Sequence, residues 1–194
     1  SKGTQIVQSG GTATGFDLTG AKQVVAGLAV STTVDAGLQT VNNGTAVSTT
    51  INQYAVQNVN NGTVAATTIS GGEQNLNGAT TATDTTLNGG TQNVNSGAMA
   101  SSTTITSGTQ NLNGGTAGKT TLNAGGVQNV NADGWALGAM ISSGGTQNVN
   151  NNGQAWVAVV NAGGVQNLNS GAISLFGVIK GGTQNVAGGA ASQL

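Results

Sequence analysis

The sequence repeats itself about every eighteen residues along its whole length. Each repeat carries a glutamine at the same position of the unit, and two residues after each of these eleven glutamines stands valine or leucine. The glutamines are 16 to 19 residues apart: Gln5, Gln23, Gln39, Gln57, Gln74, Gln92, Gln110, Gln128, Gln147, Gln166 and Gln184. Self-similarity at a short fixed period is typical of solenoids, in which each unit buries its apolar face only against its neighbours.

A second set of aliphatic residues precedes each next glutamine: Leu18, Val34, Ile51, Ile69, Leu87, Ile105, Leu122, Ile141, Val160 and Ile179. The periodic positions favour Val, Ile and Thr, which suit strands, and glycines punctuate each unit twice. Each unit therefore predicts strand, turn, strand, turn, as in 91–95 and 102–105. Residues 1–194 are expected to form a single all-β domain, a right-handed parallel β-solenoid (β-helix) of about 10–11 coils with roughly 18 residues per coil.

Alternation along each strand assigns the two faces. The glutamines share the parity of the buried Val or Leu, so we expect them to form an internal amide ladder, with the following asparagines facing solvent or forming an outer ladder. In the second strand, positions two and four before the aliphatic residue are expected to face inward. Position four carries Val30, Val47, Ala65, Leu137, Trp156 and Leu175, and alanines at position five, such as Ala46, are expected at a tight corner.

One stretch near the C-terminus breaks the repeat. The outward threonines Thr33, Thr50, Thr68, Thr86, Thr104 and Thr121 give way to Met140, Val159 and Val178, and the outward position two earlier becomes Gly138, Val157 and Phe176. The pattern predicts an apolar interaction patch of Met140, Val157, Val159, Phe176 and Val178. Because monomers seldom expose large apolar patches, we expect it to be covered by a following domain, a cap or another chain. The alternative is a local register change that turns these residues inward.

Composition excludes many activities. The chain has no His, Cys or Pro and no arginine, and its net charge is −1. These absences argue against Ser-His-Asp or Cys-His catalysis, the usual zinc sites, disulfides and nucleic-acid binding. No apolar run approaches the ~18 residues of a membrane-spanning helix, so we expect no membrane insertion of this segment.

Neither the acidic nor the aromatic residues predict a catalytic site. Asp17, Asp35, Glu73, Asp84 and Asp133 fall in different coils and phases, which favours solvated side chains over an acid pair. The turns lack the repeated aspartate of calcium-binding solenoids, so neither a metal nor a cofactor is expected. Trp135, Trp156 and Phe176 follow one another in successive coils; a sugar-stacking platform is one interpretation, and packing in the core or under a cap is the favoured one.

The unit seen in GGTQNVNSG (89–97) and SSTTITSGTQNLNGG (101–115) resembles the passenger repeats of self-associating autotransporter adhesins, the relatives of AIDA, TibA and antigen 43 on Gram-negative bacteria. The resemblance covers essentially the whole chain. It implies a non-enzymatic β-solenoid on the bacterial surface, anchored to the outer membrane or secreted, that mediates autoaggregation, biofilm formation and adhesion to host cells. The chain starts and stops inside the repeat pattern, so we expect it to be a stretch of a longer passenger.

The resemblance also implies O-linked heptose on repeat serines, added by a dedicated heptosyltransferase. The serines that match turn or strand-edge positions are Ser31, Ser48, Ser96, Ser101, Ser102, Ser142, Ser143 and Ser170. Most repeats carry Thr or Asn instead, which argues against dense modification.

Two other functions remain open from the residues alone. An ice-binding solenoid would present a flat face with regular threonines, but here only one outward threonine row is regular and it ends at Thr121. A functional-amyloid subunit is the other alternative, since a solenoid with Gln and Asn ladders could stack end to end.

Overall fold

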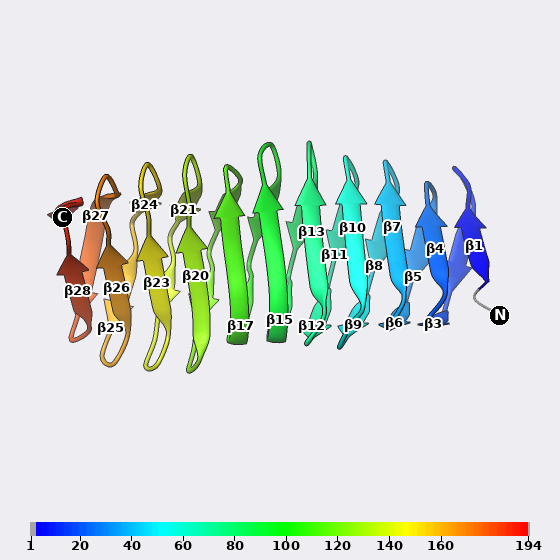
Figure 1. Cartoon of the computed structure of the whole chain (residues 1–194), viewed down its shortest axis with the longest axis horizontal. Coiled ribbons are helices and arrows are strands. Elements are labelled where there is room, and N and C mark those ends of the chain that lie inside the picture. The colour runs from blue at the N-terminus through cyan, green and yellow to red at the C-terminus, as the bar shows by residue number, and fades with distance from the viewer. Residues whose placement is uncertain (1–2, 194) are drawn as a thin grey trace.

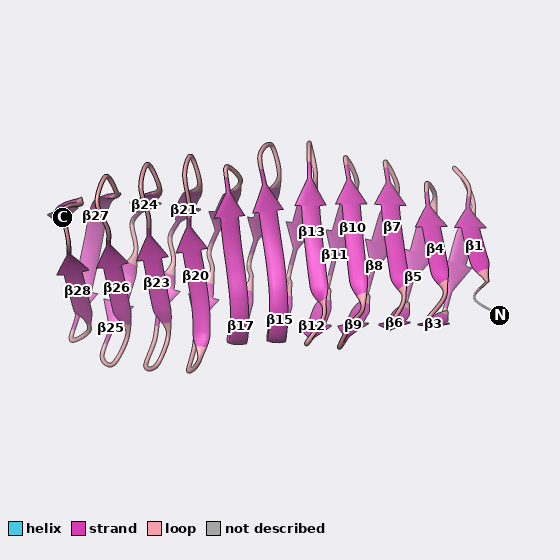
Figure 2. Ribbon diagram, viewed as in Figure 1, coloured by secondary structure: helices cyan, strands magenta, loops and turns pink. Residues whose placement is uncertain are grey.

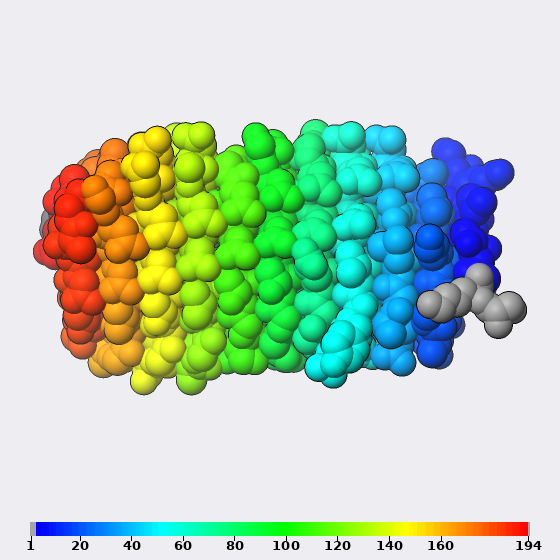
Figure 3. Space-filling model, viewed as in Figure 1, coloured from blue at the N-terminus to red at the C-terminus, as the bar shows by residue number. Residues whose placement is uncertain are grey.

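The computed structural model describes residues 3–193, which wind into one continuous parallel β-solenoid (Figure 1). The coils lie side by side along the long axis, in chain order from one end to the other, and the space-filling view shows a filled rod (Figure 3). The described residues include strands and turns but no helix (Figure 2). The predicted fold class and period are confirmed.

Each coil contributes three strand segments, and equivalent segments pair in parallel from coil to coil. The glutamine segments are β1 (Thr4–Val7), β4 (Lys22–Val25), β7 (Leu38–Asn42), β10 (Val56–Asn60), β13 (Glu73–Asn77), the second halves of β15 (Thr86–Asn95) and β17 (Thr104–Asn113), β20 (Gly126–Val130), β23 (Thr146–Val149), β26 (Val165–Leu168) and β28 (Thr183–Val186).

The middle segments follow the glutamine segments after a turn. They are β2 (Thr12–Thr14), β5 (Leu28–Val30), β8 (Thr45–Val47), β11 (Thr63–Ala65), β14 (Thr81–Thr83), β16 (Met99–Ser101), β18 (Thr116–Gly118), β21 (Trp135–Leu137), β24 (Gln154–Trp156), the first half of β27 (Ile173–Lys180) and β29 (Ala190–Gln193). The third segments are β3 (Asp17–Thr19), β6 (Thr33–Asp35), β9 (Thr50–Asn52), β12 (Thr68–Ser70), the first halves of β15 and β17, β19 (Thr121–Leu122), β22 (Met140–Ile141), β25 (Val159–Asn161) and the second half of β27.

The prediction of two strands per unit is wrong, because a corner divides the second strand into the middle and third segments. The corner residue lies three before the aliphatic residue and has left-handed backbone angles; in Ser48, for example, φ is 56°. This residue changes the direction of the chain, so the alternation counted back from the aliphatic residue does not continue through it.

Two predicted orientations are therefore wrong. The alanines expected at the corner lie within the middle segments and are buried: Ala13, Ala29, Ala46, Ala82, Ala100, Ala117, Ala136 and Ala155. The residues expected to face inward at position four are half-buried or exposed: Val30, Val47, Ala65, Leu137, Trp156 and Leu175.

Two aliphatic columns fill the interior. One combines the Val and Leu residues of the glutamine segments with the buried alanines, and the other consists mainly of the aliphatic residues of the third segments. Most members are fully buried, including Leu76 and Ile105. Each fully buried Val, Leu or Ile contributes about 1.5–3 kcal/mol, so stacking the coils supplies the burial that one coil alone lacks.

The glutamines form the predicted internal ladder. In every coil, the Nε2 atom donates to the Oε1 atom of the glutamine one coil earlier, at 2.5 to 2.7 Å from Gln23 to Gln184. Inward threonines of the corner add further bonds; Nε2 of Gln110, for example, also donates to Oγ1 of Thr103 at 3.2 Å. The ladder satisfies amides that would each cost about 1–3 kcal/mol if buried without partners.

Asparagines form two outer ladders on the same segments. The expected one runs through the residue after each glutamine, from Asn58 to Asn185, with Nδ2–Oδ1 distances of 2.8 to 3.0 Å. A second, not predicted, runs two residues further along the strand from Asn42 to Asn169. These ladders give one face of the rod a regular, uncharged amide surface.

Candidate functional site

The corner position is the most exposed periodic site on the rod. Its non-glycine residues all have φ between 52° and 56°: Ser31, Ser48, Ala66, Asp84, Ser102, Lys119, Val157 and Phe176. Gly15 and Gly138 occupy the same position in two other coils. The left-handed region costs an L-residue roughly 1–2 kcal/mol, and it is especially unusual for β-branched or bulky residues. Val157 and Phe176 therefore occupy positions where Gly, Ser or Asp would fit with less strain.

The serines predicted as modification sites differ in accessibility. Ser31, Ser48 and Ser102 lie at exposed corners, and Ser96, Ser143 and Ser170 lie at exposed turns. Ser101 and Ser142 are half-buried. Ser9 and Ser107, which the sequence interpretation omitted, are also exposed; their position in glycine-flanked turns was the available signal. Ser31 and Ser48 occupy the same corner in two successive coils, and the other serines are distributed along the rod.

The residues of the predicted apolar patch lie on three adjacent coils near the C-terminus. Parallel register places Met140 beside Val159 and Val159 beside Val178, while Val157 and Phe176 occupy successive corners. Met140, Val157 and Phe176 are exposed, and Val159 and Val178 are half-buried. All five are thus on the outside of the rod.

The apolar area is larger than the sequence indicated. Five residues of the middle segments extend it on the other side of the corner: Trp135, Leu137, Trp156, Ile173 and Leu175. Trp135 is 47% exposed and Leu137 is 52% exposed. We call these ten residues the C-terminal apolar surface: Trp135, Leu137, Met140, Trp156, Val157, Val159, Ile173, Leu175, Phe176 and Val178.

The three aromatic residues lie on this surface, so packing in the core is wrong, and packing under a cap stays a prediction. The ring centroids of Trp135 and Trp156 are 5.6 Å apart with planes inclined by 17°, a stacked pair. Phe176 meets Trp156 edge-on at 6.4 Å. Nε1 of Trp156 donates to Oε1 of Gln154 at 3.2 Å. The left-handed corner interrupts the alternation, which is why counting along the sequence did not reveal that these rings point outward.

A shallow hollow adjoins the C-terminal apolar surface. It has a volume of about 410 Å³ and is lined by Ser101, Ser102, Gly118, Lys119, Leu137, Gly138 and Val157. The two glycines create much of this space, because a Cβ added to Gly118 or Gly138 would have nothing within 4 Å. An aromatic side chain would fit into it.

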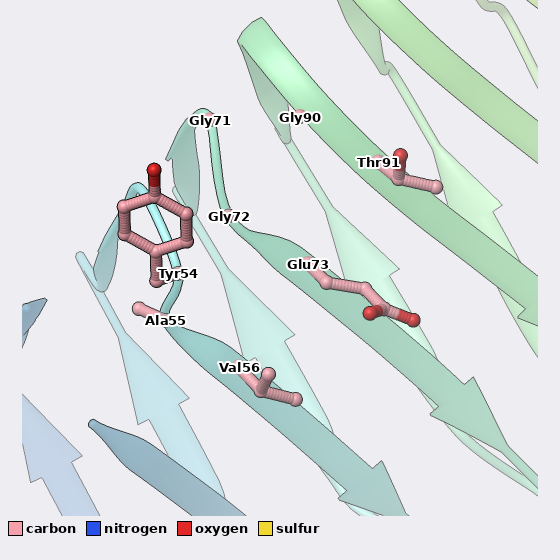
Figure 4. Close-up of a pocket in the computed structure, with 8 residues that line it drawn as sticks. All are labelled: Tyr54, Ala55, Val56, Gly71, Gly72, Glu73, Gly90 and Thr91. Carbon is pink, nitrogen blue, oxygen red and sulfur yellow. The ribbon is translucent and has the colours of Figure 1, made fainter. Parts of the chain in front are cut away.

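A second hollow, of about 270 Å³, lies at the turns of β10, β13 and β15 (Figure 4). Tyr54 stands away from its loop, 80% exposed, and the Glu73 side chain extends along the sheet. Glu73 accepts a hydrogen bond from Nδ2 of Asn93 at 3.0 Å. This arrangement offers one phenol and one carboxylate that is bonded to its neighbour, with no nucleophile–base pair.

The acidic side chains remain dispersed in the structure. Within residues 3–193, no three acidic, His or Cys side chains come close enough to hold a metal ion. In the same part of the chain, no helix has the length and apolar character needed to cross a membrane.

Comparison of the fold with solved structures finds a close match. The crystal structure of the TibC-catalysed, hyper-glycosylated TibA fragment 55–350 superposes with a TM-score of 0.93 at 35% sequence identity, and the match covers 97% of this chain and 73% of that chain. The chain belongs to the AIDA/TibA family of autotransporter adhesin passengers. Its β-solenoid resembles the β-solenoid of that adhesin fragment, and the match supports an adhesin passenger module.

The other comparisons add no functional information about this AIDA/TibA member. The pentapeptide-repeat protein HetL from the cyanobacterium Nostoc sp. PCC 7120 gives a TM-score of 0.32 at 12% identity, over 98% of this chain and 87% of that one, which is too low to support an argument. No family model and no curated protein sequence matches the chain.

Proposed function

We propose that this solenoid is a surface-displayed adhesin module that holds bacterial cells to one another and to host-cell surfaces. The observation that carries the proposal is the match to the TibA fragment along nearly the whole chain. A rod with uncharged amide ladders and a net charge of −1 suits this role, because two such rods can approach without strong repulsion between like charges. In this proposal the chain is part of a longer passenger exported to the cell surface.

Display on a non-aggregating Gram-negative strain tests the adhesive role. Cells exporting the chain through an autotransporter export domain are expected to clump and settle, and cells exporting an unrelated solenoid of similar length are not. Equal settling of the two populations, with equal surface amounts by antibody staining, would contradict the proposal.

We also propose that exposed serines of the rod accept O-linked heptose from a heptosyltransferase. The TibA fragment is hyper-glycosylated by TibC catalysis, and this chain carries comparable exposed serines at corners and turns. Ser31, Ser48 and Ser102 are the best acceptors, because the left-handed corner holds each hydroxyl away from the neighbouring strands.

Intact-mass spectrometry after co-expression with a TibC-type enzyme tests this second proposal. The wild-type chain is expected to gain whole-heptose increments, and the triple variant Ser31→Ala, Ser48→Ala, Ser102→Ala is expected to gain fewer. Ser174→Ala is the matched control, because Ser174 is fully buried in β27. A single unmodified mass for the wild type, with the enzyme active on its own substrate, would contradict the proposal.

A further inference from the structure

The C-terminal apolar surface has more exposed apolar area than an isolated chain usually leaves uncovered. Six of its members are between 37% and 52% exposed: Trp135, Leu137, Met140, Val157, Ile173 and Phe176. Aromatic side chains have ~150–250 Å² to bury and aliphatic ones less, so the ten residues together expose roughly 700 Å². The largest apolar patch of a typical monomer is ~300–600 Å², and a stable interface buries ~800 Å² per partner.

The surface contains no charged side chain. Lys119 lies at its margin, one coil before Gly138 in the corner row, and Asp133 lies in the turn before β21. The interior of the surface therefore has no charge that would require a complementary partner charge. This composition fits an apolar and uncharged partner surface, as in the cores of homodimer interfaces.

Strain at the corner supports a role for the exposed side chains themselves. Val157 and Phe176 both have φ of 56°, in positions where other coils have Gly, Ser, Ala, Asp or Lys. Strained, exposed, bulky residues are unusual unless their side chains have a function. No interior contact explains them, since both side chains are exposed.

The two ends of the surface are complementary to each other about its central coil. Four rows run along the rod, each with one residue from three successive coils: Trp135–Gln154–Ile173, Leu137–Trp156–Leu175, Gly138–Val157–Phe176 and Met140–Val159–Val178. If a second rod lies antiparallel on the first, the central residue of each row faces the same residue of the other copy. Each outer residue then faces the residue at the opposite end of the same row in the other copy. Every outer pair is then apolar, and the largest corner residue, Phe176, faces the smallest, Gly138.

We propose that a second copy of this chain covers the C-terminal apolar surface, in an antiparallel dimer whose two-fold axis lies in the interface at the level of Trp156 and Val157. In this dimer, Phe176 of each copy enters the hollow beside Gly138 of the other. The contact is isologous, so it closes after two copies. This inference deepens the proposed function by assigning self-association to one surface, and purified protein tests it independently of whether cells clump.

Two charge variants test the dimer without altering the core. Phe176→Asp and Gly138→Lys both follow precedent, because Asp84 and Lys119 occupy the same corner with φ of 55°. By analytical ultracentrifugation, the wild type is expected to dimerise. Each variant alone is expected to have a dimer dissociation constant at least tenfold higher. An equimolar mixture is expected to recover dimers, since one contact becomes an Asp–Lys pair and the other remains native.

The control is Ala66→Asp, which adds the same charge to a corner outside the surface and is expected to dimerise like the wild type. Circular dichroism spectra of all variants verify that the solenoid is intact. A monomeric wild type, or a single variant that dimerises like the wild type, would overturn the proposal. A mixture of the two variants that stays monomeric would also overturn it. A monomeric wild type that binds polysaccharide, with the binding lost in Phe176→Asp, would overturn it as well.

Discussion

The Nε2 atom of Gln110 donates to the Oε1 atom of Gln92 at 2.7 Å, and both side chains are completely buried. One coil later, Nε2 of Gln128 donates to Oε1 of Gln110 at the same distance. A single glutamine therefore satisfies two neighbours, and the ladder couples each coil to the next. This coupling makes the solenoid one cooperative array with nearest-neighbour interfaces.

Removing one rung should destabilise the array by more than one hydrogen bond. Gln110→Ala deprives Gln92 of its donor and leaves a cavity, so we expect the free energy of unfolding to fall by about 2–4 kcal/mol. Asn113→Ala removes an exposed rung, which donates to Asn95 at 3.3 Å and accepts from Asn131 at 2.8 Å, and should cost only about 1 kcal/mol because water replaces both partners. Urea unfolding and amide hydrogen exchange measure both. Equal losses in the two variants would contradict the structural role of the inner ladder.

Close contact between coils should make certain glycines irreplaceable. A Cβ added to Gly72 would clash with the backbone oxygen of Asn52 and would lie 2.6 Å from Cγ2 of Ile51. Gly72→Ala is therefore expected to cost at least about 2 kcal/mol, because two coils must separate locally. Gly118→Ala is the matched control, since its Cβ would meet nothing within 4 Å. Thermal unfolding compares them, and a Gly72→Ala variant as stable as Gly118→Ala would show that the coils pack less closely.

A substitution that relieves the strain at the corner should raise the stability of the chain. Val157→Gly relieves the left-handed strain and is expected to stabilise the monomer by about 0.5–1 kcal/mol, measured at concentrations too low for dimers. Val159→Gly, two residues later within β25, should instead destabilise it, because a strand interior disfavours glycine. A destabilised Val157→Gly monomer would mean that the Val157 side chain stabilises the single chain.

Tryptophan fluorescence should report association directly. Both tryptophans of the chain, Trp135 and Trp156, lie in the C-terminal apolar surface. Dilution of the wild type to concentrations below its dimer dissociation constant is expected to shift the emission to longer wavelength and to increase acrylamide quenching, because the rings become exposed to water. Phe176→Asp should show the monomer spectrum at all concentrations. Emission that is independent of concentration in the wild type would contradict burial of these rings in a dimer.

The repeat period made most of the fold predictable from the sequence. Glutamine and the aliphatic residue two positions later keep their spacing in every coil, so Gln92 and Val94 could be placed inside without coordinates. The corner could not be located in this way, because Ser102 adopts left-handed angles that its residue type permits but does not require. Counting alternation through that corner gave Ala100 and Trp156 the wrong orientations.

The candidate site was predicted in part for the same reason. Loss of the threonine row indicated Met140, Val159 and Val178, which lie beyond the corner and keep the counted parity. Leu137 and Leu175 lie before the corner. Alternation counted back from the aliphatic residue assigned them to the interior, so their position on the outside was not predicted. The sequence placed Gly138, Val157 and Phe176 at one repeat position, but only the structure showed that this position is the left-handed corner.

Cross-linking between introduced cysteines tests the antiparallel dimer most directly, because the chain has no cysteine of its own. One sample carries Gly138→Cys and the other Phe176→Cys, and the two are mixed and oxidised. The dimer predicts a disulfide-linked pair that contains one copy of each variant and forms faster than with Tyr54→Cys as a distant partner. Absence of that mixed pair, or equal cross-linking to the Tyr54→Cys chain, would contradict the dimer.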